Sequence, residues 1–110
     1  MNAFIVDAVR TPRGAGNEKG ALRTTRPDEL VVKLLEELGR RGVPFAAVED
    51  LVLGCVTQTG EQGGNVAKTA AMVAELPATV SAATVNRYCA SSLDAIGIGA
   101  TRIAAGMADL

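Results

Sequence analysis

The segment that follows Cys89 and ends near Gly106 constrains the fold more than any other part of the chain. It has helical character, yet its large apolar residues do not fall on one narrow stripe. Small residues occupy the positions between them: Ala95, Gly97, Gly99, Ala100, Ala104 and Ala105. Because glycine costs a helix about 1 kcal/mol per position relative to alanine, these residues indicate that other backbones come close on more than one side. A helix of this kind is buried. We expect it to lie between two sheets of a layered structure, and residues 1–110 do not supply the second of these layers.

Apolar, β-rich runs alternate with helical patterns along the whole chain. Strands are predicted for residues 4–9, 51–56 and 79–85, and helices for residues 27–38, 66–73 and 91–106. This βαβαβα order is typical of an α/β fold with a parallel sheet and right-handed connections. The first run is expected to be a buried strand. The second run is nearly continuously apolar, which is typical of a central strand covered on both faces.

Polar residues mark where the first two helices begin. Thr25 stands just before Pro27 and is the expected cap of the first helix, and Asn65 is the expected cap of the second. Gly39 and Gly42 mark the end of the first helix.

Composition excludes several classes of partner. The net charge is -1 and charged residues make up 21% of the chain. This composition does not indicate binding to nucleic acid or to a membrane surface. The chain has no secretory signal pattern and no apolar run near the roughly 20 residues needed to cross a bilayer. Cys55 and Cys89 do not form a disulfide framework. A reducing, cytoplasmic compartment is therefore expected.

Cys89 is the candidate catalytic residue, because it lies where a predicted strand turns into a predicted helix. The positive end of a helix favours the reactive thiolate form of a cysteine, and the first backbone N–H groups of a helix have no partner within it. The N–H of Cys89 is thus a candidate oxyanion donor. A base is still required, and the chain contains no histidine. Asp94 is a poor substitute, so an inert, buried Cys89 stays an open alternative.

The residues give little support to a metal site, a phosphate site or a second nucleophile. Two distant cysteines without histidine do not form a metal site, and the glycine-rich loop at residues 14–20 matches neither phosphate-binding fingerprint, so no permanently bound cofactor is expected. Cys55 lies in an apolar run and is expected to be inert packing. Ser91 and Ser92 are expected to cap the helix or pack near Cys89.

Three stretches resemble the N-terminal part of a thiolase. Residues 6–14, VDAVRTPRG, are similar to the first strand of that family and the turn after it, and residues 54–58, GCVTQ, are similar to its second strand and loop. Residues 85–96, VNRYCASSLDAI, resemble its acyl-enzyme motif, in which Asn86 precedes Cys89 and a small residue and Ser91 follow. Ser92 stands where many members have glycine, a small change that affects local packing.

The resemblance implies a layered αβαβα fold of two similar halves, in which the helix after Cys89 is central and buried. Residues 1–110 would supply its first βαβαβα segment, an incomplete N-terminal domain that ends before the next strand. Cys89 would take the acyl group of a 3-oxoacyl-CoA as a thioester and pass it to coenzyme A, or run the reverse Claisen condensation. Acyl-CoA and CoA would be its partners, with CoA as substrate, and the protein would be a homodimer or homotetramer.

The resemblance also limits what these residues can do alone. The activating histidine, second cysteine and most CoA contacts of the family lie in later segments, and Cys55 does not match that second cysteine. We therefore expect the 110-residue chain by itself to be inactive. Two alternatives remain: a ketoacyl-synthase-like condensing enzyme, and a non-catalytic, doubly wound binding or assembly module in which Cys89 only packs.

Overall fold

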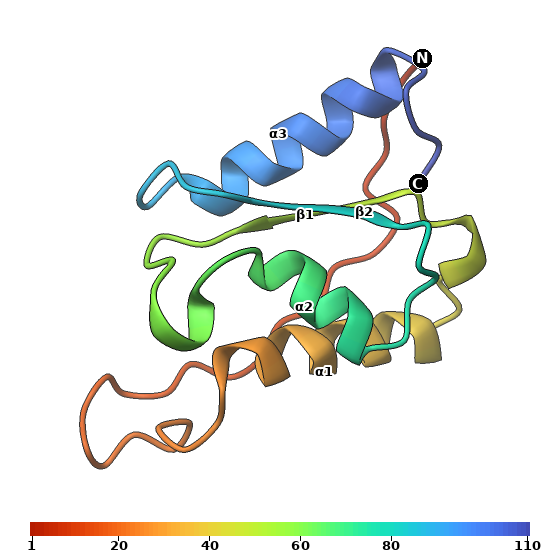
Figure 1. Ribbon diagram of the computed structural model, residues 1–110. Coiled ribbons are helices and arrows are strands. Elements are labelled where there is room, and N and C mark those ends of the chain that lie inside the picture. Colours follow the sequence, from red (N-terminus) through yellow and green to blue (C-terminus); the bar gives the residue numbers. More distant parts are fainter.

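Two parallel strands form the centre of the computed structural model, which describes residues 1–110. Strand β1 spans Asp50–Gly54 and strand β2 spans Ser81–Val85, with Asp50 opposite Ser81 and Gly54 opposite Val85. Parallel strands need a long crossover between them, and helix α2 provides it. The predicted parallel α/β arrangement is therefore confirmed (Figure 1).

Three α-helices alternate with the strands: α1 (Pro27–Arg40), α2 (Val66–Val73) and α3 (Ser91–Ala104). Two short 3-10 helices, η1 (Phe45–Ala47) and η2 (Gly60–Gln62), lie in the connections before and after β1. No helix in the structure has the length and apolar character needed to cross a membrane.

Of the expected helix boundaries, the Asn65 cap is confirmed, whereas Gly39 lies inside α1 and the cap at the start of α1 differs. Asn65 caps α2 as predicted, because its Oδ1 accepts a hydrogen bond from the Lys68 backbone N–H (3.3 Å). The cap of α1 is Arg26 and not the predicted Thr25. The Arg26 N–H donates to Glu29 Oε2 (3.4 Å), so an acidic side chain of the first turn bonds the cap residue's own N–H.

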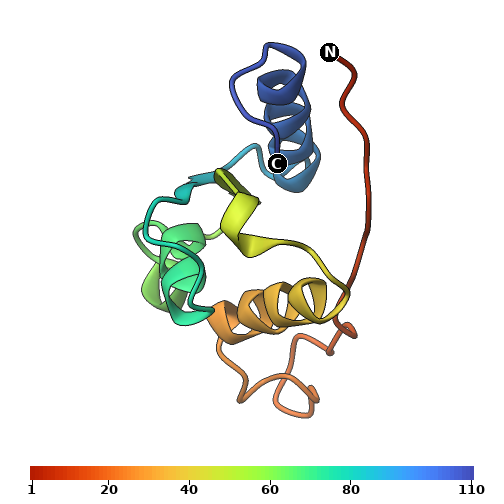
Figure 2. The same ribbon diagram turned by 90° about the vertical axis from the view of Figure 1, so that its right-hand side faces the viewer.

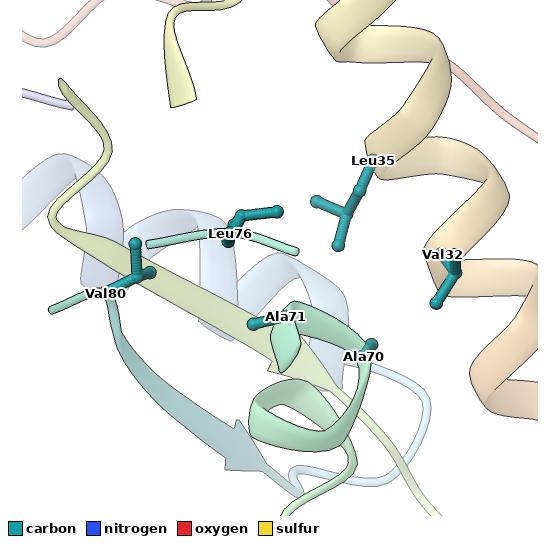
Figure 3. Packing of buried hydrophobic residues seen from close by; sticks show 6 residues of the cluster. All are labelled: Val32, Leu35, Ala70, Ala71, Leu76 and Val80. Carbon is teal, nitrogen blue, oxygen red and sulfur yellow. The ribbon is translucent and has the colours of Figure 1, made fainter. Parts of the chain in front are cut away.

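The two faces of the sheet are covered differently (Figures 1 and 2). Helix α3 packs on one face, and α2 packs on the other with α1 beside it. The buried core lies on the α1 and α2 side and is made of Val32, Leu35, Ala70, Ala71, Leu76 and Val80 (Figure 3). Strand β1 is covered on both faces as predicted, but β2 pairs with only one of its edges, so β1 is not central.

The prediction of a buried first strand is wrong. Residues 1–26 contain no helix or strand, and Phe4, Ile5 and Val6 are 77%, 80% and 77% exposed. Its first part runs along the side of the molecule from the end of α3 to the end of α1, and the rest forms a loop that leads to the start of α1 (Figures 1 and 2). The amino group of Met1 donates to the Ala104 carbonyl (3.2 Å), and Asp7 pairs with Arg41 (3.2 Å). The apolar run pairs with no strand, and its side chains are exposed.

Helix α3 begins and ends close to its predicted positions, but it is not buried on several sides. Only Ser91 and Ala95 are buried in it, whereas Leu93 is 72% and Ile96 is 58% exposed. The described residues place one sheet against α3 and no second layer, as the sequence predicts, so α3 is only partly covered by them.

Candidate active site

Cys89 lies in the turn formed by residues 86–90, between β2 and α3, and it is exposed. The turn follows the carboxyl end of β2, at the same end of the sheet as the loop after β1 (Figure 1). In open α/β sheets, ligands bind beyond the carboxyl ends of the strands. The predicted placement of Cys89 at a strand-to-helix turn is confirmed.

The turn has an uncommon backbone conformation one residue before the cysteine. Tyr88 has a φ of 49°, a left-handed conformation that costs a residue other than glycine about 1–3 kcal/mol. Asn86 Oδ1 accepts a hydrogen bond from the Tyr88 N–H (2.8 Å), a local bond that favours tight turns. The side chain of Asn86 therefore stabilises the conformation that Tyr88 adopts.

Ser91 closes the turn from the helix side. Its side chain is buried, and its hydroxyl accepts from the Arg87 N–H (2.9 Å) and donates to the Tyr88 carbonyl (2.6 Å). The cap residue of α3 is Ala90, which makes no side-chain cap bond. Of the two roles expected for Ser91, packing beside the Cys89 turn is the one observed.

The turn is also fixed against the end of β1. The side-chain amide of Asn86 donates to the Val56 carbonyl (3.0 Å), and the Cys55 N–H donates to the Val85 carbonyl (2.9 Å). The start of α3 lies directly on Gly54, where a Cβ atom would be 2.4 Å from the Ser92 nitrogen. Only glycine permits this approach, because real Cβ atoms do not come so close to backbone.

The charged residues near Cys89 pair with one another. Arg87 Nε lies 3.0 Å from Asp94 Oδ1, so the only carboxylate in the first turn of α3 is held by an arginine. The backbone N–H of Cys89 donates to no acceptor in the structure. The site thus offers an exposed thiol and a free backbone donor, and the chain contains no histidine to act as a base.

Cys55 occupies a different environment. It is half-buried just after β1, and its sulfur lies 3.7 Å from the Thr57 carbonyl oxygen. It is therefore less buried than the inert packing role predicted. A separate hollow of about 180 Å³ lies between β1 and α3, but its lining includes neither cysteine.

Sequence reasoning gave no role in the site to Gly54 or Tyr88, and it noted Asn86 only as part of the motif around Cys89. Asn86 carried a usable signal, since an asparagine shortly before a helix start is typical of a side-chain-bonded turn. The contact of Gly54 with α3 joins distant parts of the chain and has no local signal.

Comparisons with known proteins agree on one family. A family model described as the N-terminal domain of thiolase matches residues 3–110. The chain is 46% identical over 110 residues to the 3-oxoadipyl-CoA/3-oxo-5,6-dehydrosuberyl-CoA thiolase of Escherichia coli K12, and the match covers 98% of the chain and 27% of that protein. It is 43% identical to a 3-ketoacyl-CoA thiolase of Yersinia enterocolitica, over 99% of the chain and 28% of that protein. The chain thus spans about a quarter of the length of these relatives.

Two crystal structures show a similar arrangement. The Acat5 thiolase of Ascaris suum in complex with coenzyme A matches with a TM-score of 0.74 and 28% identity, over 82% of this chain and 24% of that one. The acetyl-CoA acetyltransferase of Bacillus anthracis matches with a TM-score of 0.74 and 38% identity, over 81% of this chain and 23% of that one.

Proposed function

Because the chain belongs to the thiolase family, we propose that it carries the nucleophile of an acyltransferase that moves acyl groups between a cysteine and coenzyme A. The observation that supports this most is the exposed Cys89, held in a turn at the carboxyl end of the sheet. Its substrates are 3-oxoacyl-CoA and CoA in the direction of thiolysis, and two acyl-CoA molecules in the direction of condensation.

The proposed reaction has two steps. The Cys89 thiolate attacks the keto carbon of 3-oxoacyl-CoA, and the bond between that carbon and the CH₂ of the CoA thioester breaks. The resulting carbanion takes a proton from an acid outside these residues and leaves as acetyl-CoA. The acyl group stays on sulfur as a thioester. The thiolate of a second CoA then attacks the thioester carbonyl, a new acyl-CoA is released, and Cys89 regains its thiolate. In both steps negative charge develops on an oxygen, which the free N–H of Cys89 can bind.

A proton acceptor for the Cys89 thiol is required in the first step. The chain has no histidine, and the Asp94 carboxylate is paired with Arg87. On this proposal the base comes from outside these residues, as the resemblance to thiolases implies. The chain of 110 residues therefore catalyses no thiolysis by itself, and measurable turnover by the purified chain would contradict this part of the proposal.

Matched cysteine variants test the assignment of the nucleophile. The assay follows thiolysis of acetoacetyl-CoA by the protein in its active form, with its base present. Replacing Cys89 by serine should lower kcat more than about a thousandfold, as loss of a nucleophile does in other enzymes. Cys55→Ser is the matched control and should keep kcat within about threefold of the parent, since Cys55 lies outside the turn. A Cys89→Ser protein that keeps the parental rate would refute the proposal.

A further inference from the structure

The conformation of the Cys89 turn needs a physical cause. Tyr88 holds a left-handed backbone conformation, but its side chain is 77% exposed, so packing of the Tyr88 ring does not enforce it. Strained backbone persists only where the surrounding structure determines it. The groups that determine it here are hydrogen bonds to the peptide units on either side of Tyr88.

Asn86 supplies one of these bonds and uses the other end of the same amide to bond the chain after β1. Its Oδ1 accepts from the Tyr88 N–H (2.8 Å), and its Nδ2 donates to the Val56 carbonyl (3.0 Å). The first bond shapes the turn, and the second attaches the turn to the chain that leaves β1. A single amide group therefore sets both the conformation of the turn and its place on the sheet.

Ser91 supplies the bonds from the opposite side. Its side chain is buried, with the residue 4% exposed, and its hydroxyl bonds both the Arg87 N–H (2.9 Å) and the Tyr88 carbonyl (2.6 Å). The Ser91 hydroxyl also lies 3.5 Å from Asn86 Oδ1. Together, the two side chains fix three of the backbone polar groups that immediately precede Cys89.

We propose that Asn86 and Ser91 are positioning residues for Cys89, which hold the backbone that carries its thiol and its free N–H in the orientation that acyl transfer requires. Neither side chain contacts the reacting atoms on this account. The inference rests on the proposed role of Cys89 and deepens it, because it assigns the geometry of the nucleophile to two named side chains and to the end of β1.

The first test compares two asparagines that are bonded alike. Asn65 also uses both ends of its amide, donating to the Ala82 carbonyl (2.9 Å) and accepting from Thr84 Oγ1 (2.8 Å), but it lies outside the turn. In the active protein, Asn86→Ala should lower kcat about a hundredfold with KM changed less than about threefold, as expected for a misplaced reacting group. Asn65→Ala should keep kcat within about threefold of the parent once the folded fraction is taken into account. Equal effects of the two variants on kcat would overturn the inference.

The second test separates the Ser91 hydroxyl from its volume. Ser91→Ala removes both hydroxyl bonds and should lower kcat about tenfold. Ser91→Thr keeps the hydroxyl and should recover most of that loss. If both variants are equally impaired, the hydroxyl bonds do not position Cys89 and the inference fails for Ser91.

A third measurement does not depend on enzyme activity. The rate at which iodoacetamide alkylates Cys89 is measured by peptide mass spectrometry in the same protein, with Cys55 as the internal reference. Asn86→Ala should change the ratio of the two rates by at least about fivefold, because the turn loses its set conformation. An unchanged ratio would overturn the inference even if Cys89 proves to be the nucleophile. A protein without acyl transfer but with a changed ratio would overturn the proposed function alone.

Discussion

The two faces of the sheet are held by different kinds of interaction. On one face, α1 and α2 bury a continuous cluster of aliphatic side chains that includes Leu35, 7% exposed. On the other face, α3 leaves Leu93 72% and Ile96 58% exposed, and only Ser91 and Ala95 are buried in it. Near its start, Gly54 and Asn86 fix the turn, and near its end Arg102 pairs with Asp50. One face supplies hydrophobic stability, while the other presents a reactive turn held by polar bonds and a backbone contact.

This division explains how a strained turn is tolerated. Full burial of a large aliphatic side chain contributes about 1.5–3 kcal/mol, so the α1 and α2 face supplies stability that does not depend on the Cys89 turn. The turn itself holds a conformation that costs about 1–3 kcal/mol at Tyr88. Hydrogen bonds from Asn86 and Ser91 hold the turn in this conformation.

The largest effect is expected from a pair of matched leucine substitutions. Leu35→Ala should lower the free energy of unfolding of the 110-residue chain by about 3 kcal/mol, because it leaves a cavity in the buried cluster. Leu93→Ala should change it by less than about 0.5 kcal/mol, because that side chain is exposed. Urea unfolding followed by circular dichroism measures both changes. Equal losses of unfolding free energy would contradict the claim that hydrophobic stability comes from the α1 and α2 face.

Gly54→Ala should have the next largest effect, and it acts on the α3 face. The new methyl group would meet the Ser92 nitrogen at 2.4 Å and the Ser91 carbonyl carbon at 2.5 Å, so the start of α3 must move. Forced rearrangements of this kind cost about 1–3 kcal/mol. Thermal unfolding measures the loss. Gly97→Ala, with no atom near its Cβ position, is the matched control and should not destabilise the chain.

The smallest effect is expected at the far end of α1 and depends on pH. Hydrogen bonds from Arg40, and then from Arg41, lower the pKa of Glu37 from 4.5 to about 2. A lowered pKa means that the carboxylate stabilises the fold above about pH 4.5 and that this contribution is lost as the pH falls toward 2. Glu37→Gln should therefore unfold at a slightly lower temperature than the parent at pH 6, with the difference shrinking near pH 2. A difference that grows on acidification would contradict this assignment.

Most of the elements of the fold could be predicted because their signals are local. The spacing of apolar residues and the Asn65 cap placed α2, and the continuous apolar run at β1 placed a covered strand. The same kind of run at Phe4 led to a wrong prediction, because an apolar pattern indicates extended chain but does not provide a partner strand. The exposure of Leu93 agrees with the prediction that α3 needs a second layer that residues 1–110 do not supply.

The candidate site could be predicted only in part for the same reason. Cys89 was placed correctly from a β-branched run followed by a helical pattern. The bond from Asn86 to Val56 and the contact of Gly54 with Ser92 join residues that are distant in sequence. Their geometry depends on how β1, β2 and α3 pack together, so local patterns do not reveal it.

The most direct test of the account is the site of acylation in the active protein. Incubation with acetoacetyl-CoA in the absence of free CoA, followed by acid quenching and peptide mass spectrometry, detects a thioester on cysteine. The account predicts an acetyl group on the peptide that contains Cys89 and none on the peptide that contains Cys55. A protein that cleaves acetoacetyl-CoA while Cys89 stays unmodified, or that carries the acetyl group on Cys55, would contradict it.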